Sequence, residues 1–180
     1  MRTPLRTSLI GASAVAIALT GFALPRSASA QALNDPTIVA IFDAANTWDI
    51  ETGNLAAKRA KSKEVREFGQ MLVRDHKAVR QQGRDLAKKL GVTPTPPKDF
   101  AMAKDHADAL KKLNAAKGKE FDRAFLAHEV AYHKAVIDAV NTTLMPALQN
   151  AEVKHLVTVV APAFKAHEDA AQNMLDKQGK

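Results

Sequence analysis

Residues 119–144 read KEFDRAFLAHEVAYHKAVIDAVNTTL, and this stretch decides the fold. Apolar residues recur in it at steps of four and three, with one histidine in the series: Leu126, Val130, His133, Ile137, Val140 and Leu144. Such steps place the whole series on one side of a helix with 3.6 residues per turn. Pro146 follows and ends the pattern. The stretch therefore predicts a long helix that buries one face along its full length.

Three further stretches have the same periodicity, at about residues 35–60, 63–90 and 151–175. No stretch alternates apolar and polar residues in the manner of a β-strand. Four amphipathic helices of similar length predict an all-α fold, namely an antiparallel four-helix bundle. The connection between the second and third helices begins with a proline-rich linker. A short amphipathic segment at about residues 101–113 follows it and predicts an extra helix in this crossover.

The first thirty residues have the features of a cleavable signal peptide. Two arginines precede an apolar stretch at residues 9–24, and Ala-Ser-Ala at residues 28–30 matches an A-x-A cleavage site. An uncleaved membrane anchor is the alternative, but the apolar stretch is short for a span. The sequence predicts a signal peptide at residues 1–30, a single domain at residues 31–180, and a periplasmic or otherwise exported location.

The composition excludes several classes of function. The 180 residues contain no cysteine, which excludes disulfides and thiolate ligands. The formal net charge is +7, and loss of the three arginines in residues 1–30 would leave +4. The basic runs are short and lack interleaved aromatic residues, so they indicate solvated helix faces and no nucleic-acid partner. No segment after residue 30 is long and apolar enough to cross a membrane, and the oligomeric state stays open.

Three of the six histidines occupy core positions in the helical series. His76, His133 and His167 each lie near the middle of a different predicted helix. The middles of the helices in a bundle lie at similar height, so the three imidazoles are expected to converge. Glu51 fills a gap in the series of the remaining helix and would complete the group. The other histidines lie off the series and are expected to be exposed to solvent: His106, His128 and His155.

These four residues have the chemistry of a metal site. A buried carboxylate or imidazole without partners is costly, and one central cation would satisfy all four groups. Three imidazoles and a carboxylate suit Zn²⁺, Cu²⁺, Fe²⁺ or Mn²⁺, with copper and zinc favoured by the Irving–Williams order. Asp75, Glu129 and Tyr132 are candidates for orienting these ligands. The sequence therefore predicts a transition-metal site formed by His76, His133, His167 and Glu51.

Two alternatives stand beside a metal-binding protein. Glu51 and Asp75 paired with protonated histidines would form a metal-free polar network, as in a structural or interaction module of the cell envelope. A metal-dependent enzyme would require a cavity and an open coordination position, and the sequence favours binding over catalysis. Di-iron chemistry is disfavoured because the residue three positions before each of the three core histidines is apolar, whereas di-iron bundles use Glu-x-x-His.

Several stretches match a known pattern: residues 49–56 (DIETGNLA), 62–76 (SKEVREFGQMLVRDH), 120–126 (EFDRAFL) and 133–136 (HKAV), followed by the late His167. Through them the chain resembles a bacterial family of exported, ferritin-like domains of unknown function, and the resemblance covers nearly all of the mature chain. It implies a four-helix ferritin-like bundle and no established activity. The family pattern has Asp-His in both helical hairpins, whereas the second pair here is Tyr132-His133. A symmetric role for two aspartates is therefore not expected.

Overall fold

The computed structural model describes residues 33–98 and 100–178, and all regular structure within them is helical. The prediction of an all-α helical bundle is confirmed for this part of the chain, whereas the predicted signal peptide lies outside it. The elements are α1 (Asp35–Arg59), α2 (Lys63–Leu90), α3 (Ala101–Ala115), α4 (Gly118–Ala139), the π-helix η1 (Val140–Leu144), α5 (Met145–Ala147) and α6 (Ala151–Gln178).

Local chemistry fixes where the first two helices begin and end. The Asn34 side chain accepts a hydrogen bond of 3.0 Å from the backbone N–H of Thr37 and so caps α1. Gly91 ends α2 in the left-handed conformation, with φ of 65°, which costs glycine no steric strain. The Asp35 carboxylate accepts backbone N–H bonds from Gln149 and Asn150, both of 2.9 Å. This contact ties the start of α1 to the turn before α6.

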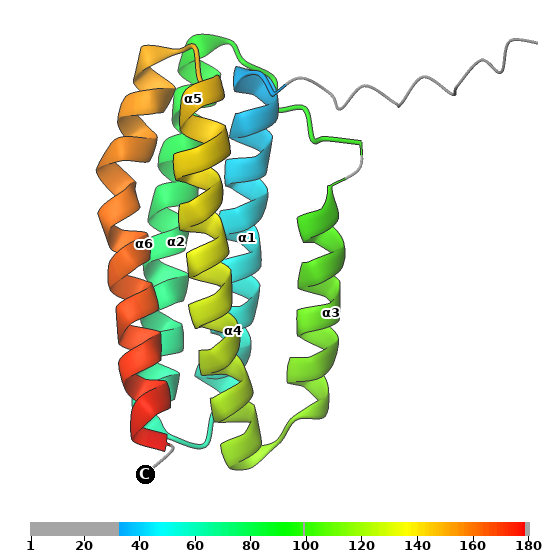
Figure 1. The fold of residues 1–180 in the computed structure, drawn as a ribbon, viewed down its shortest axis with the longest axis vertical. Helices are drawn as coiled ribbons and strands as arrows, with labels where there is room; N and C mark the ends of the chain where they lie inside the picture. Colours follow the sequence, from blue (N-terminus) through cyan, green and yellow to red (C-terminus); the bar gives the residue numbers. More distant parts are fainter. Residues whose placement is uncertain (1–32, 99, 179–180) are drawn as a thin grey trace, which may run out of the picture. The chain divides into compact units, whose positions relative to one another are not determined.

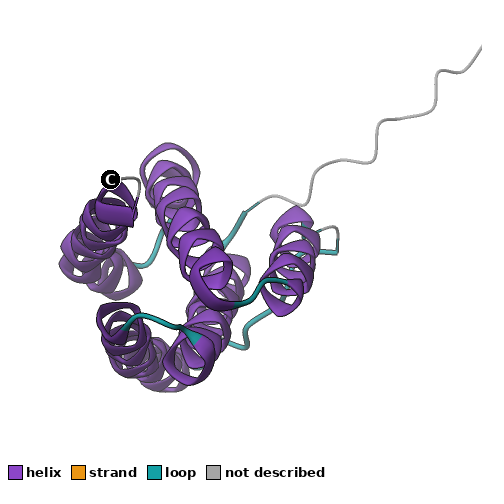
Figure 2. Cartoon of the chain, turned by 90° about the horizontal axis from the view of Figure 1, so that it is seen from below, coloured by secondary structure: helices purple, strands orange, loops and turns teal. Residues whose placement is uncertain are grey.

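Helices α1, α2, α4 and α6 lie side by side, and α3 stands against the outside of this group (Figures 1 and 2). The most extensive contacts join α1 to α2 and α4 to α6, and the two pairs meet through α2 with α6 and α1 with α4. The α4 helix runs on through η1 into α5 with right-handed helical dihedrals at the junctions. Within the described residues, no helix combines the length and apolar character needed to span a bilayer.

The α1 and α2 helices approach each other closely at two glycines. A Cβ atom on Gly69 would lie 2.7 Å from the carbonyl oxygen of Gly53, and one on Gly53 would lie 2.9 Å from that of Gly69. Real Cβ atoms do not approach a backbone oxygen so closely, so both positions require glycine. The close approach brings the polar side chains of α1 within reach of α2.

Two apolar clusters form the core, one at each end of the bundle. The upper cluster, near the start of α1, consists of Ile38, Val39, Ile41, Ala87, Val140, Leu144, Leu148, Val153 and Val157. The lower cluster consists of Ala56, Ala60, Val65, Phe68, Leu72, Leu113, Phe121, Phe125, Leu126, Ala171 and Met174. Burial of these side chains supplies the main stabilisation of the fold.

A layer of buried polar side chains separates the two clusters. This polar layer consists of Asn46, Asp49, Thr52, His76, Glu129, His133 and His167. The chain passes from the upper to the lower cluster along α1 and α6, and in the reverse direction along α2 and α4. All four helices therefore contribute to the polar layer from their middle sections.

Candidate metal centre

The structure brings together the three histidines that the sequence singled out. His76 comes from α2, His133 from α4 and His167 from α6, and all three are buried. The ring centroids lie 5.1 Å apart for His76 and His167, 5.3 Å for His133 and His167, and 5.6 Å for His76 and His133. One nitrogen atom from each ring lies within 4.8 Å of the other two. The three rings therefore surround a single point.

The outward nitrogen of each ring faces an oxygen acceptor. His76 Nδ1 lies 2.9 Å from the amide oxygen of Asn46, His133 Nδ1 lies 3.0 Å from the main-chain oxygen of Glu129, and His167 Nε2 lies 3.3 Å from a carboxylate oxygen of Asp75. The Asn46 amide group donates in turn to the carbonyl of Phe42, which directs its oxygen towards His76. Each outward nitrogen therefore donates a proton, and the lone pair resides on the other nitrogen.

The inward nitrogens of the same rings have no hydrogen-bond partner among the described residues. They are Nε2 of His76, Nε2 of His133 and Nδ1 of His167. Buried polar atoms in native proteins are nearly always paired, so three unpaired atoms at one point require an explanation. In metal-binding histidines, the ring nitrogen that does not bind the metal generally donates to an oxygen acceptor. The outward nitrogens of His76, His133 and His167 do the same.

Asp49 occupies the place beside the histidines for which the sequence analysis proposed Glu51. Its Oδ2 atom lies 3.4 Å from His76 Nε2 and 3.8 Å from His133 Nε2. The Asp49 carboxylate is buried, its Oδ1 atom is unpaired, and within the described residues no lysine or arginine contacts it. A fourth ligand atom is thus available next to the three nitrogens.

Glu51 itself is not brought to this point, because it lies on the outer face of α1. Its carboxylate is about half exposed and accepts a hydrogen bond of 2.7 Å from Nε2 of His106 on α3. His106 is 7% exposed and its ring stacks on Trp48, so the expectation that His106 faces solvent is wrong. The reason is that His106 lies on the face of α3 that contacts α1, between Trp48 and Glu51. His155 is exposed as expected, and His128 is partly buried.

The three residues proposed as orienting groups lie in different relations to the site. Asp75 contacts His167 and also accepts from Arg74 at 2.9 Å. Glu129 is fully buried, accepts from the Thr52 hydroxyl at 2.9 Å through Oε1, and has its Oε2 atom unpaired. The hydroxyl of Tyr132 donates to the main-chain oxygen of Ala45 at 3.0 Å, and the centroid of its ring lies 6.0 Å from that of His133.

Burial sets the charges of the site. Desolvation first, then repulsion from the neighbouring rings, lowers the pKa of His76 to about 2 and that of His133 to about 3. Desolvation also lowers the pKa of His167, against the opposing effect of Asp75. The three imidazoles are therefore neutral at pH 7, the form that binds metal ions. Desolvation raises the pKa of Glu129 to about 7 and raises that of Asp49, where the charge of Glu129 adds to the effect.

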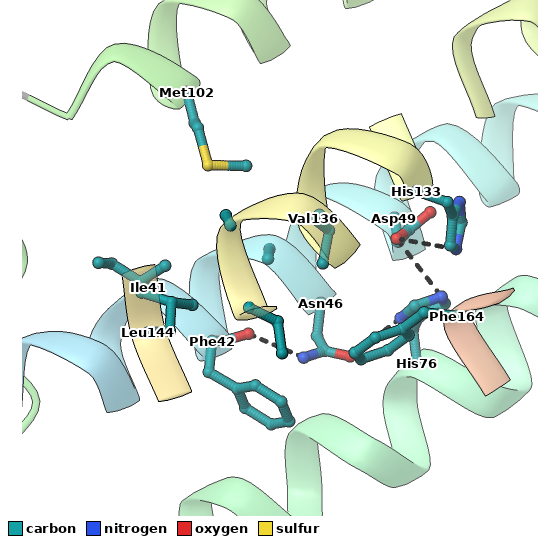
Figure 3. Close-up of a pocket in the computed structure, with 13 residues that line it drawn as sticks. Ile41, Phe42, Asn46, Asp49, His76, Met102, His133, Val136, Leu144 and Phe164 are labelled. Atoms are coloured by element: carbon teal, nitrogen blue, oxygen red, sulfur yellow. Dashed lines mark hydrogen bonds and ion pairs between the residues drawn. The ribbon is translucent and has the colours of Figure 1, made fainter. Parts of the chain in front are cut away.

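A cavity of about 30 Å³ adjoins the site. Asp49, His76 and His133 line one end of it, and apolar side chains such as Ile41 and Leu144 line the other (Figure 3). A space of this size accommodates one or two water molecules. The site therefore has room for a small additional ligand next to its three inward nitrogens.

Sequence reasoning missed Asp49 and Asn46, although a signal for both was present. Asn46, Asp49, Gly53, Ala56 and Ala60 follow each other at steps of three and four, and all five are buried. The apolar series of the same helix draws attention to the neighbouring face instead. Small and polar residues at helical spacing thus marked the core face of α1.

Comparisons with known proteins identify the family. The model of a domain family of unknown function, DUF4142, matches residues 22–174. The chain belongs to the DUF4142 family. No curated protein sequence matches the chain. A solved structure described as "CopM in the Cu(II)-bound form" has a similar fold, with a TM-score of 0.63 and 15% identity over 81% of this chain and 98% of that chain. At this identity the likeness concerns the fold alone.

Among the described residues of this DUF4142 domain, two groups of buried side chains have the geometry to hold a metal ion. One consists of His76, His133 and His167, and the other of Asp49, Glu129 and His133. Nitrogen donors dominate the first group and carboxylate oxygens the second.

Proposed function

We propose that the protein binds one transition-metal ion in its polar layer through His76, His133, His167 and Asp49. The observation that carries this proposal is the pairing pattern of the imidazoles. Each outward nitrogen has an oxygen acceptor, whereas each inward nitrogen is buried without a partner. Among the described residues, Nδ1 of His106 is also buried and unpaired, but it lies alone, whereas the three inward nitrogens lie together, and buried polar atoms are nearly always paired.

The energetic argument follows from burial. An unpaired buried polar atom costs about 1–3 kcal/mol, and the layer holds several of them at one point. A cation at that point would satisfy three nitrogens at once and would favour the ionised form of Asp49, whose pKa burial raises. Deprotonated inward nitrogens and oriented rings mean that little rearrangement precedes binding.

The donor set narrows the class of metal. Three imidazoles and one carboxylate suit Cu²⁺ and Zn²⁺ above Fe²⁺ and Mn²⁺. The CopM structure of similar fold is described as Cu(II)-bound, which makes Cu²⁺ the first probe to use.

The cavity favours binding over catalysis on an organic substrate. Pockets that hold organic ligands have volumes of about 300–1,000 Å³, whereas the cavity beside the histidines measures about 30 Å³. We therefore propose storage, buffering or delivery of a metal ion in preference to an enzyme. A metal-free envelope module remains the alternative that the experiments below exclude or support.

We also infer an antiparallel, ferritin-like four-helix arrangement for residues 31–180 and export directed by residues 1–30. The reversal of chain direction between α1 and α2 and between α4 and α6 supports the arrangement. The A-x-A tripeptide after an apolar stretch supports export to the periplasm. Sequencing the N-terminus of the mature protein would test the export proposal, which requires a start at Gln31.

The metal content of purified protein tests the proposed function. Protein that has been freed of metal and then dialysed against Cu²⁺ should hold about one ion per chain, because the donor set fits one ion. His76→Ala should hold much less, since it removes a central ligand. His155→Ala is the matched control, because His155 is an exposed histidine of α6, and it should behave as the unmodified protein. Equal metal content in all three proteins would overturn the proposal.

A further inference from the structure

We propose that a metal ion bound in the polar layer keeps one coordination position open towards the adjoining cavity, and that this position takes a neutral diatomic molecule such as carbon monoxide or dioxygen. This inference rests on the proposed function and adds to it the class of a second ligand. Three features of the site support it: the donors that line the cavity, the helix that forms part of its wall, and its apolar surface.

Three of the four proposed ligands line the cavity. Asp49, His76 and His133 lie at its inner end, whereas His167 is not among the described residues that line it (Figure 3). An ion held by the three imidazoles therefore has His167 behind it and its remaining positions on the side of Asp49 and the cavity. Asp49 accounts for one of these positions, and metal ions with four ligands can take a further one from outside.

The π-helix η1 forms part of the cavity wall. Its first and last residues, Val140 and Leu144, are buried and line the cavity. The η1 segment continues α4, and its start lies about two helical turns beyond His133. π-helical turns within α-helices are rare and lie frequently at functional sites. A π-helical wall next to a candidate metal site indicates a ligand pocket rather than a gap in the packing.

The surface of the cavity selects an uncharged ligand. Its described lining residues include no lysine or arginine, and apart from the proposed ligands and Asn46 they are apolar. The Asn46 amide is already bonded to His76 and to the carbonyl of Phe42. An anion in the cavity would therefore lack a hydrogen-bond donor, which is costly at a buried site. A neutral diatomic molecule needs no such partner, and a volume of about 30 Å³ holds one.

Cu⁺ is the ion for which such a ligand is expected. Carboxylates suit hard cations and bind the soft Cu⁺ weakly, whereas imidazoles suit copper. Cu⁺ bound by the three imidazoles therefore has its fourth position open beside Asp49. A diatomic molecule in the cavity lies next to this position.

Carbon monoxide is the probe, because it binds Cu⁺ and gives an infrared band in a region where proteins do not absorb. Protein loaded with Cu⁺ under argon in the presence of ascorbate should take up one carbon monoxide molecule per copper. The bulky tert-butyl isocyanide also binds Cu⁺ but should be excluded, because its branched group exceeds a volume of about 30 Å³. Copper on a surface histidine would accept both molecules. This comparison needs no variant to fold.

A variant that fills the cavity tests the same pocket. Ala139 lies at the end of α4 and lines the cavity. Ala139→Leu should weaken carbon monoxide binding by at least about tenfold without loss of copper. Ala135→Leu is the matched control, because Ala135 is an exposed alanine of the same helix. It should bind carbon monoxide as the unmodified protein does.

The outcomes are distinct. Uptake of carbon monoxide with exclusion of tert-butyl isocyanide, together with weakened uptake in Ala139→Leu alone, supports the pocket. Failure of copper-loaded protein to take up carbon monoxide, binding of both molecules, or equal binding by the two alanine variants would overturn the pocket while leaving the proposed function intact. Should Ala139→Leu lose copper as well, the comparison of the two molecules on the unmodified protein decides.

Two further results would count against the proposals. An azide-to-copper charge-transfer band from the Cu²⁺-loaded protein would overturn the neutral class of ligand, because it would show that an anion enters the cavity. Absence of bound copper from the unmodified protein would overturn the proposed function itself.

Discussion

The three core histidines are oriented by three chemically different acceptors. His76 faces an amide oxygen, His133 a main-chain carbonyl and His167 a carboxylate that is also bound to Arg74. A charged acceptor raises the basicity of its imidazole more than a neutral one does. His167 is therefore expected to be the most electron-rich ligand, and His76 the one most dependent on a single side chain for its orientation.

Removal of the Asn46 side chain tests this dependence. Asn46→Ala should weaken Cu²⁺ binding by about 10–100-fold, because His76 loses the acceptor that fixes its proton on Nδ1. The folded content by circular dichroism should not change. Asn54→Ala, on the same helix, is the control, and the affinity is measured by competition with a chelator. Equal affinities of the two variants would mean that Asn46 does not orient the ligand.

The buried charges also make the metal-free protein sensitive to acid. Folded His76 and His133 remain neutral down to pH of about 3, whereas the unfolded chain takes up protons below about 6.5. Stability is therefore complete above pH 6.5 and falls by about 1.4 kcal/mol per pH unit for each histidine below it. Glu129 and Asp49 act in the opposite sense, because burial raises the pKa of Glu129 to about 7 and also raises that of Asp49, so the folded state binds these protons first as the pH falls.

The carboxylates therefore offset part of the loss caused by the histidines until the unfolded carboxylates are protonated as well. The free energy of unfolding should decline slowly between pH 6.5 and about 4.5 and steeply below that. Urea denaturation in the presence of a chelator measures it. His76→Leu should show a shallower decline below pH 4.5, and a decline identical to that of the unmodified protein would contradict the assigned pKa of His76.

At the scale of elements, the contact of α1 with α2 holds the α1 side of the polar layer in place. Gly69→Ala should destabilise the protein by about 1–3 kcal/mol or more, because the new methyl group would meet the backbone of α1 rather than a flexible side chain. Gln70→Ala, at the exposed neighbouring position, should change stability by less than about 0.5 kcal/mol. A Gly69→Ala protein as stable as this control would show that the two helices can separate at no cost.

In α4 and α6, the apolar residues at steps of three and four predicted the buried face, because these apolar residues are the ones that face the core. In α1, apolar character and burial do not coincide. Trp48 and Leu55 are apolar but only partly buried, whereas the polar Asn46 and Asp49 face the interior. A polar core face is invisible to a search for apolar periodicity, so the prediction placed Glu51 where Asp49 lies.

The location of α3 was beyond sequence reasoning for a different reason. Its amphipathic pattern predicted a helix but not the face of the bundle that it would cover. Arg59 of α1 donates to the main-chain oxygens of Leu113 and Ala116 at 3.3 and 3.0 Å and so holds the end of α3. The contact depends on residues more than fifty positions apart, which local spacing does not reveal.

At the scale of the whole molecule, a metal ion would act as a cross-link. His76, His133, His167 and Asp49 belong to four different helices, and the layer that they form separates two apolar clusters. Without the ion, the middle of the bundle holds buried imidazole nitrogens that have no hydrogen-bond partner among the described residues. With it, the same layer joins all four helices.

Thermal unfolding tests this cross-link and separates it from a metal-free network. At a free Cu²⁺ concentration about 100 times Kd, binding to the folded state alone adds about 2.7 kcal/mol. For a chain of this length the midpoint should then rise by about 5–10 °C over that in chelator. His155→Ala should show the same rise, and His76→Ala little or none. A midpoint that is indifferent to chelator would favour the metal-free network.

Anomalous diffraction from crystals of the Cu²⁺-loaded protein tests the central claim most directly. The account predicts one anomalous peak inside the bundle, about 2.0–2.1 Å from Nε2 of His76, Nε2 of His133 and Nδ1 of His167. A bundle without an anomalous peak at these nitrogens, or with copper only on surface histidines such as His155, would contradict it.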